Sequence, residues 1–334
     1  MRRKCCRSIG KSVGSARIGK SLQADCICLR WGCQKRCCLR IPLAGLSGTD
    51  AWLVMLFYTL QLYFDFSGYC DMGRGIAHML GMELPVNFDS PYKASNIIEF
   101  WKRWHITLNR FLRKYVYIPL GGNRKGTARM YLNLFIVFLV SGIWHGAGWN
   151  FVLWGALHGA LYLVTRAWQR RQPWQLKQPR QQCAADVHVQ SGTKKSGVFS
   201  AVQHVLCVAL TFLFLNFTWM LFRSANLSQA GEFVGRLIGG GFAAPAVQIT
   251  EAFNLEEFWY VIKILHLDRL PGSELYLCFG FWAVALWLVF FARNAGEREK
   301  SFEPNGKTMF VTAFLMIWCV VSLSGVSSFL YYRF

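Results

Sequence analysis

Blocks of apolar residues alternate with polar loops along this chain, and the blocks predict helices that cross or enter a membrane. Spanning the hydrocarbon core of a bilayer takes roughly 20 mostly apolar residues. Several blocks are shorter, so we expect some helices to dip into the bilayer or to cross it as broken helices. The candidate segments are Ala51–Phe66, Met130–Trp144, Trp149–Thr165, Ala201–Phe222, Leu275–Ala292 and Met309–Gly325.

The composition supports a membrane location. Hydrophobic residues make up 54% of the 334 residues and charged residues only 16%, whereas a soluble domain usually carries about 25% charged residues. So small a polar complement cannot cover a soluble particle of this size. The predicted fold class is therefore all-α, a multi-pass integral membrane protein with re-entrant and amphipathic helices.

The net charge of +20 indicates topology rather than nucleic-acid binding. Basic patches bind the phosphates of nucleic acids, but much of this excess lies in loops between apolar segments, where cytoplasmic Lys and Arg are expected. The loops 93–129 and 166–199 are strongly basic, whereas 223–274 holds four basic and six acidic residues. The positive-inside rule places the first two in the cytoplasm, 223–274 outside and 293–308 inside again. The expected surroundings are a lipid bilayer, with no nucleic acid.

Residues 1–46 differ from the rest of the chain. They hold eleven Lys and Arg, one acidic residue and seven of the twelve cysteines. No C-x-x-C pair occurs among them and the nearest histidine is His78, so the spacing of a zinc site is missing. An apolar core of the kind found in signal peptides is missing too. Two interpretations remain, a disordered basic tail or a stretch read in a shifted frame, and we favour the second.

Two aspartates interrupt an apolar stretch early in the membrane region. A charge at bilayer depth costs about 2.5–3.5 kcal/mol on insertion scales, so Asp65 and Asp71 are expected to face a cavity or a partner. The residues Ser67–Gly68, together with Gly73 and Gly75, would let the helix break at this point. The alternative is a helix end at the membrane interface, where both carboxylates are solvated.

A second segment, 95–122, has the pattern of one amphipathic helix. Its apolar residues recur at steps of four and three, which places them on one helix face. Basic residues occupy the remaining positions, as in helices that lie at a membrane surface. The apolar positions are Ile97, Trp101, Trp104, Leu108, Phe111 and Tyr115.

A histidine lies on the border between the two faces of this predicted helix. His105 follows Trp101 by four residues, and a lone histidine at such a border often only fills the interface. The basic face beside it would suit a phosphorylated donor such as acetyl-coenzyme A. A functional role for His105 and a filling role both remain open from the residues alone.

Two G-x-x-x-G motifs, 142–146 and 155–159, follow on adjacent apolar segments. Small residues at this spacing let membrane helices approach closely. Each motif carries a histidine just before its second glycine, His145 and His158. An imidazole in a membrane suits proton transfer because its pKa lies near neutrality. The alternative is a structural hydrogen bond between helices, which we favour for His158.

Five motifs occur in a fixed order along the chain. They are L-Y-F-D-F-S-G-Y-C-D-M (62–72), N-F-D-S-P-Y (87–92), F-W-K-R-W-H-I-T-L (100–108), Y-I-P-L-G-G-N-R-K-G (117–126) and W-H-G-A-G-W-N-F-V-L-W-G-A-L-H-G (144–159). Together they resemble the membrane-bound O-acyltransferase family, most closely its branch that acetylates alginate and more distantly its D-alanyl transferases. The resemblance covers 47–334, which we take as one membrane domain. Family members carry further membrane helices before the first motif, so the resemblance implies a C-terminal portion.

The resemblance implies helices around a tunnel that joins a cytoplasmic donor to an exported acceptor. It implies that His145 is the catalytic base and His105 the second histidine of the site. The donor is expected to be acetyl-coenzyme A, with no bound cofactor and no metal. The residues assigned to donor and substrate binding are Trp101, Arg103, Trp104, Asn109, Asp65 and Asp71.

The expected activity is O-acetylation of an exported, alginate-type polysaccharide at the inner membrane. The expected partners are the polysaccharide and an exported-side acetyltransferase or carrier protein. Three other interpretations remain open: D-alanyl or other acyl transfer to an envelope polymer, an inactive truncated remnant, and a transporter. Broken helices and buried ionisable residues suit a transporter equally well.

Overall fold

The computed structural model describes residues 45–171, 198–251, 263–264, 266, 273–300 and 305–322. The predicted basic N-terminal region therefore lies almost entirely outside the described residues. Within the described ranges the chain forms helices and no strands, which confirms the all-α fold. The elements up to the second basic loop are α3 (Gly48–Met79), η2 (Pro91–Lys93), α4 (Ile97–Arg103), α5 (Ile106–Leu112), η3 (Arg113–Tyr117), α6 (Thr127–His145) and α7 (Trp149–Arg171). Those after it are α8 (Val198–Arg223), α9 (Leu227–Gly239), α10 (Val247–Glu251), α12 (Ser273–Phe290), α13 (Ala295–Lys300) and α14 (Gly306–Ser322).

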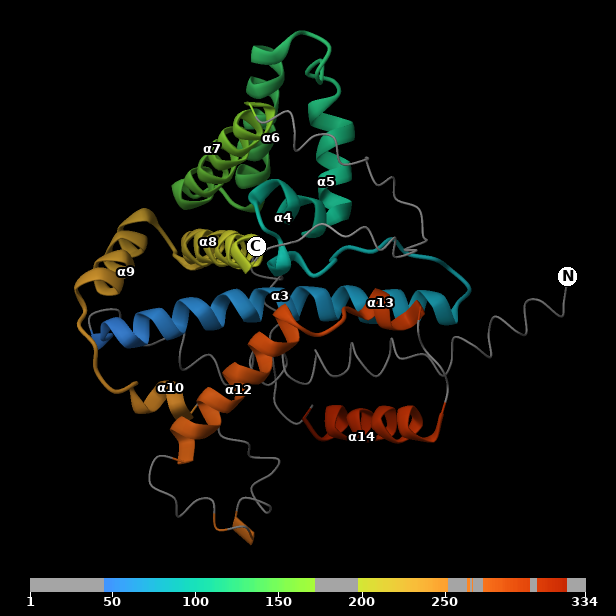
Figure 1. The fold of residues 1–334 in the computed structure, drawn as a ribbon, viewed down its shortest axis with the longest axis vertical. Helices are drawn as coiled ribbons and strands as arrows, with labels where there is room; N and C mark the ends of the chain where they lie inside the picture. The colour runs from blue at the N-terminus through green and yellow to red at the C-terminus, as the bar shows by residue number, and fades with distance from the viewer. Residues whose placement is uncertain are drawn as a thin grey trace, which may run out of the picture.

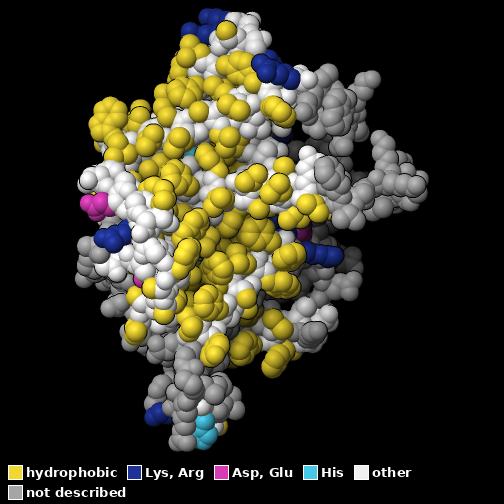
Figure 2. All heavy atoms as spheres, turned by 60° about the vertical axis from the view of Figure 1, so that its left-hand side comes forward, with side chains coloured by type: hydrophobic (Ala, Val, Ile, Leu, Met, Phe, Trp, Pro, Cys, Tyr) yellow, Lys and Arg dark blue, Asp and Glu magenta, His cyan; other side chains and the backbone are white. Residues whose placement is uncertain are grey.

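The six predicted apolar segments correspond to α3, α6, α7, α8, α12 and α14. Two helical stretches in the described ranges are long and apolar enough to cross a bilayer, Thr127–His145 and Ala201–Arg223, and two further apolar stretches are shorter, Leu275–Phe290 and Thr308–Ile317. Figure 2 shows a broad field of hydrophobic side chains on one face of the molecule, with Lys and Arg mainly at its edges. Such a face suits contact with lipid.

Helix α3 runs across the middle of the molecule, with α6 and α7 on one side and α12 and α14 on the other (Figure 1). A capping box between Ser47 and Asp50 begins it. The helix continues for 32 residues without interruption, so the predicted break at Ser67–Gly68 is wrong. A glycine inside a helix costs only about 1 kcal/mol. Buried aromatic side chains such as Phe66, which packs on Phe88 at 4.9 Å between ring centroids, offset that cost.

Helices α6 and α7 form a tight hairpin, as the small-residue motifs predict. A Cβ atom added at Gly155 would lie 2.5 Å from the carbonyl oxygen of Phe138, and one at Gly142 would collide with the carbonyl oxygen of Phe151. The two backbones therefore approach each other closely at the glycines. Because His145 is the last residue of α6 and Trp154 lies on α7, this hairpin fixes their relative positions.

The core is aromatic and lies where α3, α4, α7 and α8 meet. Trp104 packs on Trp219 of α8 with 5.0 Å between ring centroids, and it stacks on Phe100 at 5.5 Å. The hydroxyl of Tyr92 donates to the carbonyl of Thr59 at 2.9 Å, which attaches the segment before α4 to α3. The core thus fixes the 87–105 region against α3.

Candidate active site

The segment 95–122 is not one helix, and the predicted continuous amphipathic helix is wrong. Helix α4 ends at Arg103, and His105 adopts a left-handed backbone conformation with φ 43° before α5 begins. A non-glycine residue in this conformation is disfavoured by roughly 1–2 kcal/mol. Hydrogen bonds compensate, since the side-chain amide of Asn109 donates to the carbonyls of Trp101 and Trp104 at 2.5 and 2.7 Å. The break turns His105 away from a regular helix face.

The ring of His105 is held on the side of α3. Its Nδ1 lies 3.1 Å from Oδ1 of Asn87, and its ring packs edge-on against Phe66 with 4.8 Å between centroids. Its Nε2 atom is buried and has no hydrogen-bond partner in the described part of the chain. Burial lowers the pKa of His105 to about 4, because the charged ring is desolvated. The imidazole is therefore neutral at physiological pH.

The predicted catalytic base, His145, lies near His105. His145 closes α6, and its ring contacts Phe222 and Trp154 with centroid distances of 4.8 and 5.6 Å. It also lies within electrostatic range of His105. The fold thus brings together two histidines that are 40 residues apart in the sequence.

A pocket of about 690 Å³ opens among α4, α5, α6 and α7. Four of its lining side chains are cationic and none is acidic, so it attracts anions. Aromatic and apolar side chains form the remaining walls. The cationic residues are Lys102, Arg110, Arg113 and Arg166, and the aromatic residues are Trp101, Tyr117, Phe138 and Tyr162.

Aromatic contacts connect this pocket to His145. Trp101 lines the pocket and lies 5.8 Å from Trp154, whose ring in turn lies 5.6 Å from His145. Phe138, also in the pocket wall, precedes His145 by seven residues on α6, which corresponds to about 10 Å along the helix axis. The pocket and His145 therefore contact the same cluster of packed aromatic side chains.

His158, the other histidine of the two G-x-x-x-G motifs, has the surroundings of a structural residue. His158 is fully buried, and its Nε2 pairs with the hydroxyl of Thr218 on α8 at 3.0 Å. This contact matches the hydrogen bond between helices that we favour from the sequence. It joins α7 to α8 beside Trp154.

The residues assigned to donor and substrate binding are distributed over three environments. Trp101 and Asn109 line the pocket, whereas Trp104 lies in the aromatic core. Asp65 and Asp71 lie on α3, partly buried and outside the pocket lining, and Asp71 pairs with Arg74 at 3.6 Å.

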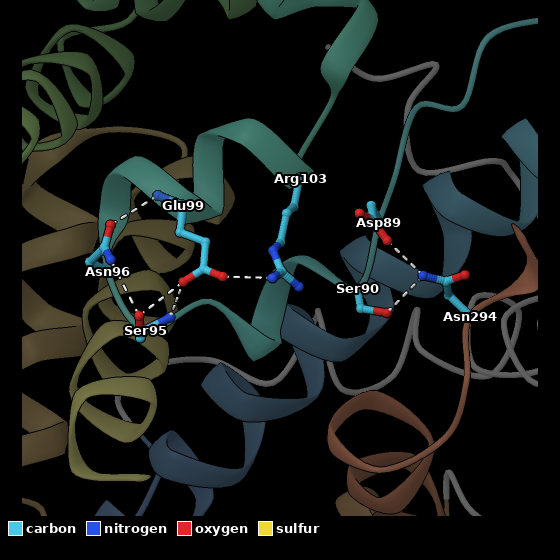
Figure 3. Close-up of polar contacts among 7 residues, drawn as sticks. All are labelled: Asp89, Ser90, Ser95, Asn96, Glu99, Arg103 and Asn294. Atoms are coloured by element: carbon cyan, nitrogen blue, oxygen red, sulfur yellow. Dashed lines mark hydrogen bonds and ion pairs between the residues drawn. The ribbon is translucent and has the colours of Figure 1, made fainter. Parts of the chain in front are cut away.

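Arg103 also lies outside the pocket lining, because it pairs with Glu99 at 2.6 Å (Figure 3). Ser95 donates to the same carboxylate through its backbone amide and its hydroxyl, each at 2.9 Å. Burial alone would raise the pKa of Glu99, but these hydrogen bonds and the guanidinium outweigh it, and the pKa is lowered. The pair stabilises α4, and Lys102 is the α4 cation that lines the pocket.

Two features of the site are missing from the sequence prediction. Arg166 and Tyr162 reach the pocket from α7, more than 50 residues after α4. Asn87, whose side chain contacts the ring of His105, lies in the N-F-D-S-P-Y motif, and this motif could have identified Asn87 from the sequence. No group of three or more His, Cys, Asp or Glu residues in the described ranges could hold a metal ion.

Residues 46–189 match the model of MBOAT, the membrane-bound O-acyltransferase family. This range contains the pocket, both histidines and Asn87, so the site described above lies inside the matched region.

Several curated proteins are similar to the chain. It is 45% identical over 195 residues to the peptidoglycan O-acetyltransferase of Helicobacter pylori, covering 58% of this chain and 33% of the relative. It is 42% identical over 203 residues to a protein of Pseudomonas putida named "Probable alginate O-acetylase AlgI", covering 61% and 36%. It is 30% identical over 176 residues to the teichoic acid D-alanyltransferase of Streptococcus thermophilus, covering 50% and 42%. The chain therefore spans about a third of the length of the first two relatives.

Proposed function

Because the chain belongs over residues 46–189 to the membrane-bound O-acyltransferase family, we propose that it carries the acyl-transfer centre of a membrane O-acetyltransferase. This enzyme moves an acetyl group from cytoplasmic acetyl-coenzyme A to an exported polysaccharide of the cell envelope. The observation that carries the proposal is the cationic pocket joined to His145 by Trp101 and Trp154.

The pocket suits the donor in both charge and shape. Coenzyme A carries several phosphate charges at one end and a thioester at the end of a long, narrow arm. Arginine pairs with phosphate through two parallel hydrogen bonds, and Arg110, Arg113 and Arg166 supply three such groups. With the phosphates there, the arm extends past Trp101 and Trp154, and the thioester approaches His145.

The reaction then needs one base. His145 takes the proton from an acceptor hydroxyl, and the resulting oxygen nucleophile forms a bond to the carbonyl carbon of the thioester. The carbon–sulfur bond breaks, and the coenzyme A thiolate leaves and takes up the proton from His145. A positioned general base contributes about 10²–10⁴-fold to the rate of such a step.

The acceptor is a polysaccharide, and two candidates come from the names of the relatives. An alginate-type polymer agrees with the alginate O-acetylase likeness, and peptidoglycan agrees with the relative at 45% identity. An exported-side acetyltransferase or carrier protein receives the acetyl group or delivers the polymer. The protein resides in the inner membrane as a multi-pass protein, with the cationic pocket on the cytoplasmic side.

A second candidate activity is D-alanyl transfer to teichoic acid, which the Streptococcus relative favours. Its donor is carried by a protein rather than by coenzyme A. Binding of acetyl-coenzyme A to the purified chain therefore separates the two activities. Release of free coenzyme A separates acetyl transfer from a transporter, which releases none.

The test uses the full chain in detergent, where the donor and the acceptor can both reach it. Equilibrium dialysis with labelled acetyl-coenzyme A measures donor binding, and release of free coenzyme A in the presence of alginate or peptidoglycan measures transfer. His145→Ala should keep donor binding and lose about 10²–10⁴-fold in transfer rate. His204→Ala, at an exposed position of α8, is the matched control and should change neither. Absence of saturable donor binding, or full transfer by His145→Ala, would contradict the proposal.

A further inference from the structure

We propose that Asn87 is a positioning residue that fixes the tautomer of His105, so that the ring offers a bare Nε2 lone pair to the acceptor hydroxyl. The tautomer follows from the geometry alone, whereas its use in the reaction rests on the proposed function.

The orientation of the Asn87 side chain is determined by one backbone group. Its Oδ1 lies 3.2 Å from the backbone nitrogen of Thr107 and 2.9 Å from the Thr107 hydroxyl. A backbone N–H can only donate, so the atom that faces it must be the amide oxygen. On its other side, Nδ2 donates to the Cys70 thiol of α3 at 3.2 Å. A flipped amide would place NH₂ against N–H, which excludes that alternative.

The same oxygen determines where the proton of His105 lies. Nδ1 of His105 is 3.1 Å from Oδ1 of Asn87, and an amide oxygen can only accept a hydrogen bond. Nδ1 must therefore carry a proton and donate it. A neutral imidazole has a single N–H, so Nε2 carries the lone pair. The lowered pKa of His105 agrees with a neutral ring.

The backbone holds this arrangement in place. The backbone nitrogen of Ile106 donates to the carbonyl of Asn87 at 3.0 Å, just after the left-handed residue His105. Asn87 therefore supports both the strained backbone and the ring of the same histidine. This double attachment explains how a helix break between α4 and α5 can hold a side chain in one orientation.

The free lone pair indicates a ligand. Nε2 of His105 is buried and without a partner in the described part of the chain, and a buried polar atom left unsatisfied is destabilising. A hydroxyl group can donate to it. His105 is not part of the cationic pocket lining, so we assign this lone pair to the acceptor rather than to coenzyme A. A hydroxyl has a single proton to donate, so His105 holds the incoming hydroxyl and His145, which lies within electrostatic range, then takes that proton.

An amide at position 87 also keeps the ring uncharged. The titratable groups that approach this assembly include His145 at the end of α6 and Cys70 of α3, which bonds to Asn87. Asp71 and Arg74, on the same helix as Cys70, lie within electrostatic range of its thiol. A carboxylate at position 87 would accept the same hydrogen bonds, but its charge would favour the imidazolium form. Asn87→Asp should therefore keep the tautomer near neutral pH and move protonation of His105 to higher pH.

The first test is spectroscopic and needs no activity. In the purified chain labelled with ¹⁵N-histidine, the His105 signals are identified by their loss in His105→Gln. The wild-type ring should show one protonated Nδ1 and a bare Nε2. Asn87→Leu should give a mixture of tautomers, and Thr107→Val, which keeps the backbone donor, should retain the wild-type form. A wild-type ring protonated at Nε2 overturns the proposal whether or not the chain transfers acetyl groups.

The second test separates positioning from mere stability. Asn87→Leu should lower kcat by roughly 10²–10⁴-fold with donor affinity unchanged. Asn87→Asp should retain activity at neutral pH, with the acidic limb of its pH profile moved upward. If both variants lose activity equally with no shift of the limb, Asn87 acts only on folding and the proposal fails. If wild-type transfer is absent while the predicted tautomer is found, the proposed function fails and the tautomer assignment stands.

Discussion

Replacing Gly155 by alanine tests the close approach between the backbones of α6 and α7. The added Cβ atom would lie 2.5 Å from the carbonyl oxygen of Phe138, 3.2 Å from its carbonyl carbon and 3.4 Å from Cα of Leu139. All three are backbone atoms of α6, and none can rotate away. The helices must therefore separate, or the backbone of one must bend.

The size of the effect follows from these distances. An ordinary contact lies at roughly 3.5–4.0 Å, so the helices must move apart by about 1 Å. Overpacking of this kind costs about 1–3 kcal/mol. Alanine recovers up to about 1 kcal/mol through its higher helix propensity. We expect Gly155→Ala to lower the free energy of unfolding by about 1–2 kcal/mol.

Unfolding in mixed detergent micelles, followed by tryptophan fluorescence, measures this change. Gly235→Ala is the matched control, because a Cβ atom there meets nothing within 4 Å on the exposed side of α9. It should leave stability unchanged or raise it by up to about 1 kcal/mol. Gly155→Ala should also reduce transfer, since the hairpin sets His145 against Trp154. Equal stability of the two variants would refute the close packing.

Three further predictions follow from the pocket, the α4 ion pair and the charge bias. Arg113→Gln should raise the KM for acetyl-coenzyme A roughly tenfold with little change in kcat, because one charge-assisted contact to a phosphate is lost. The control is Lys114→Gln, next to Arg113 but outside the pocket lining, which should change neither KM nor kcat. Because the pKa of Glu99 is lowered from its ordinary 4.5, its stabilising contribution is present above that value and is lost as the pH falls through the folded pKa. Glu99→Gln should therefore reduce the acid dependence of thermal unfolding. In a background without native cysteines, an impermeant thiol reagent should label Ser228→Cys in intact cells. The same reagent should label Arg124→Cys only after the inner membrane is opened. Labelling of Arg124→Cys in intact cells would overturn the topology.

The sequence predicts most of the helices because apolar content alone determines them. Long apolar blocks must be helical in a membrane, where every backbone group needs a partner within its own segment. The small-residue motifs add the α6–α7 hairpin, since glycines four residues apart create a smooth helix face. The spacing of W-H-G and G-A-L-H-G on that hairpin therefore identifies His145 and His158 as neighbours of the packing surface.

Helix interruptions were predicted in the wrong places. Glycines within α3 indicate a break, yet the helix continues because aromatic packing outweighs a small local cost. A regular spacing from Ile97 to Tyr115 indicates one helix, yet the chain breaks at His105. The apolar positions beyond the break show the consequence, since Phe111 and Tyr115 are exposed while Trp101 and Trp104 are buried. Tertiary contacts decide both outcomes, and a periodic pattern contains no information about them.

Under the proposed function, the break at His105 would let one short segment serve two ligands. In an unbroken helix, the basic side chains of 102–113 and His105 would share one surface, and the histidine would face the donor. The break instead directs His105 toward α3 and Asn87, while Lys102 and Arg113 remain in the pocket wall beside α6 and α7. Under the proposed function, the left-handed φ of His105 separates the side chain assigned to the acceptor from the side chains assigned to the donor. Local strain at such positions persists only where surrounding contacts determine it, and the backbone and side-chain bonds of Asn87 are those contacts.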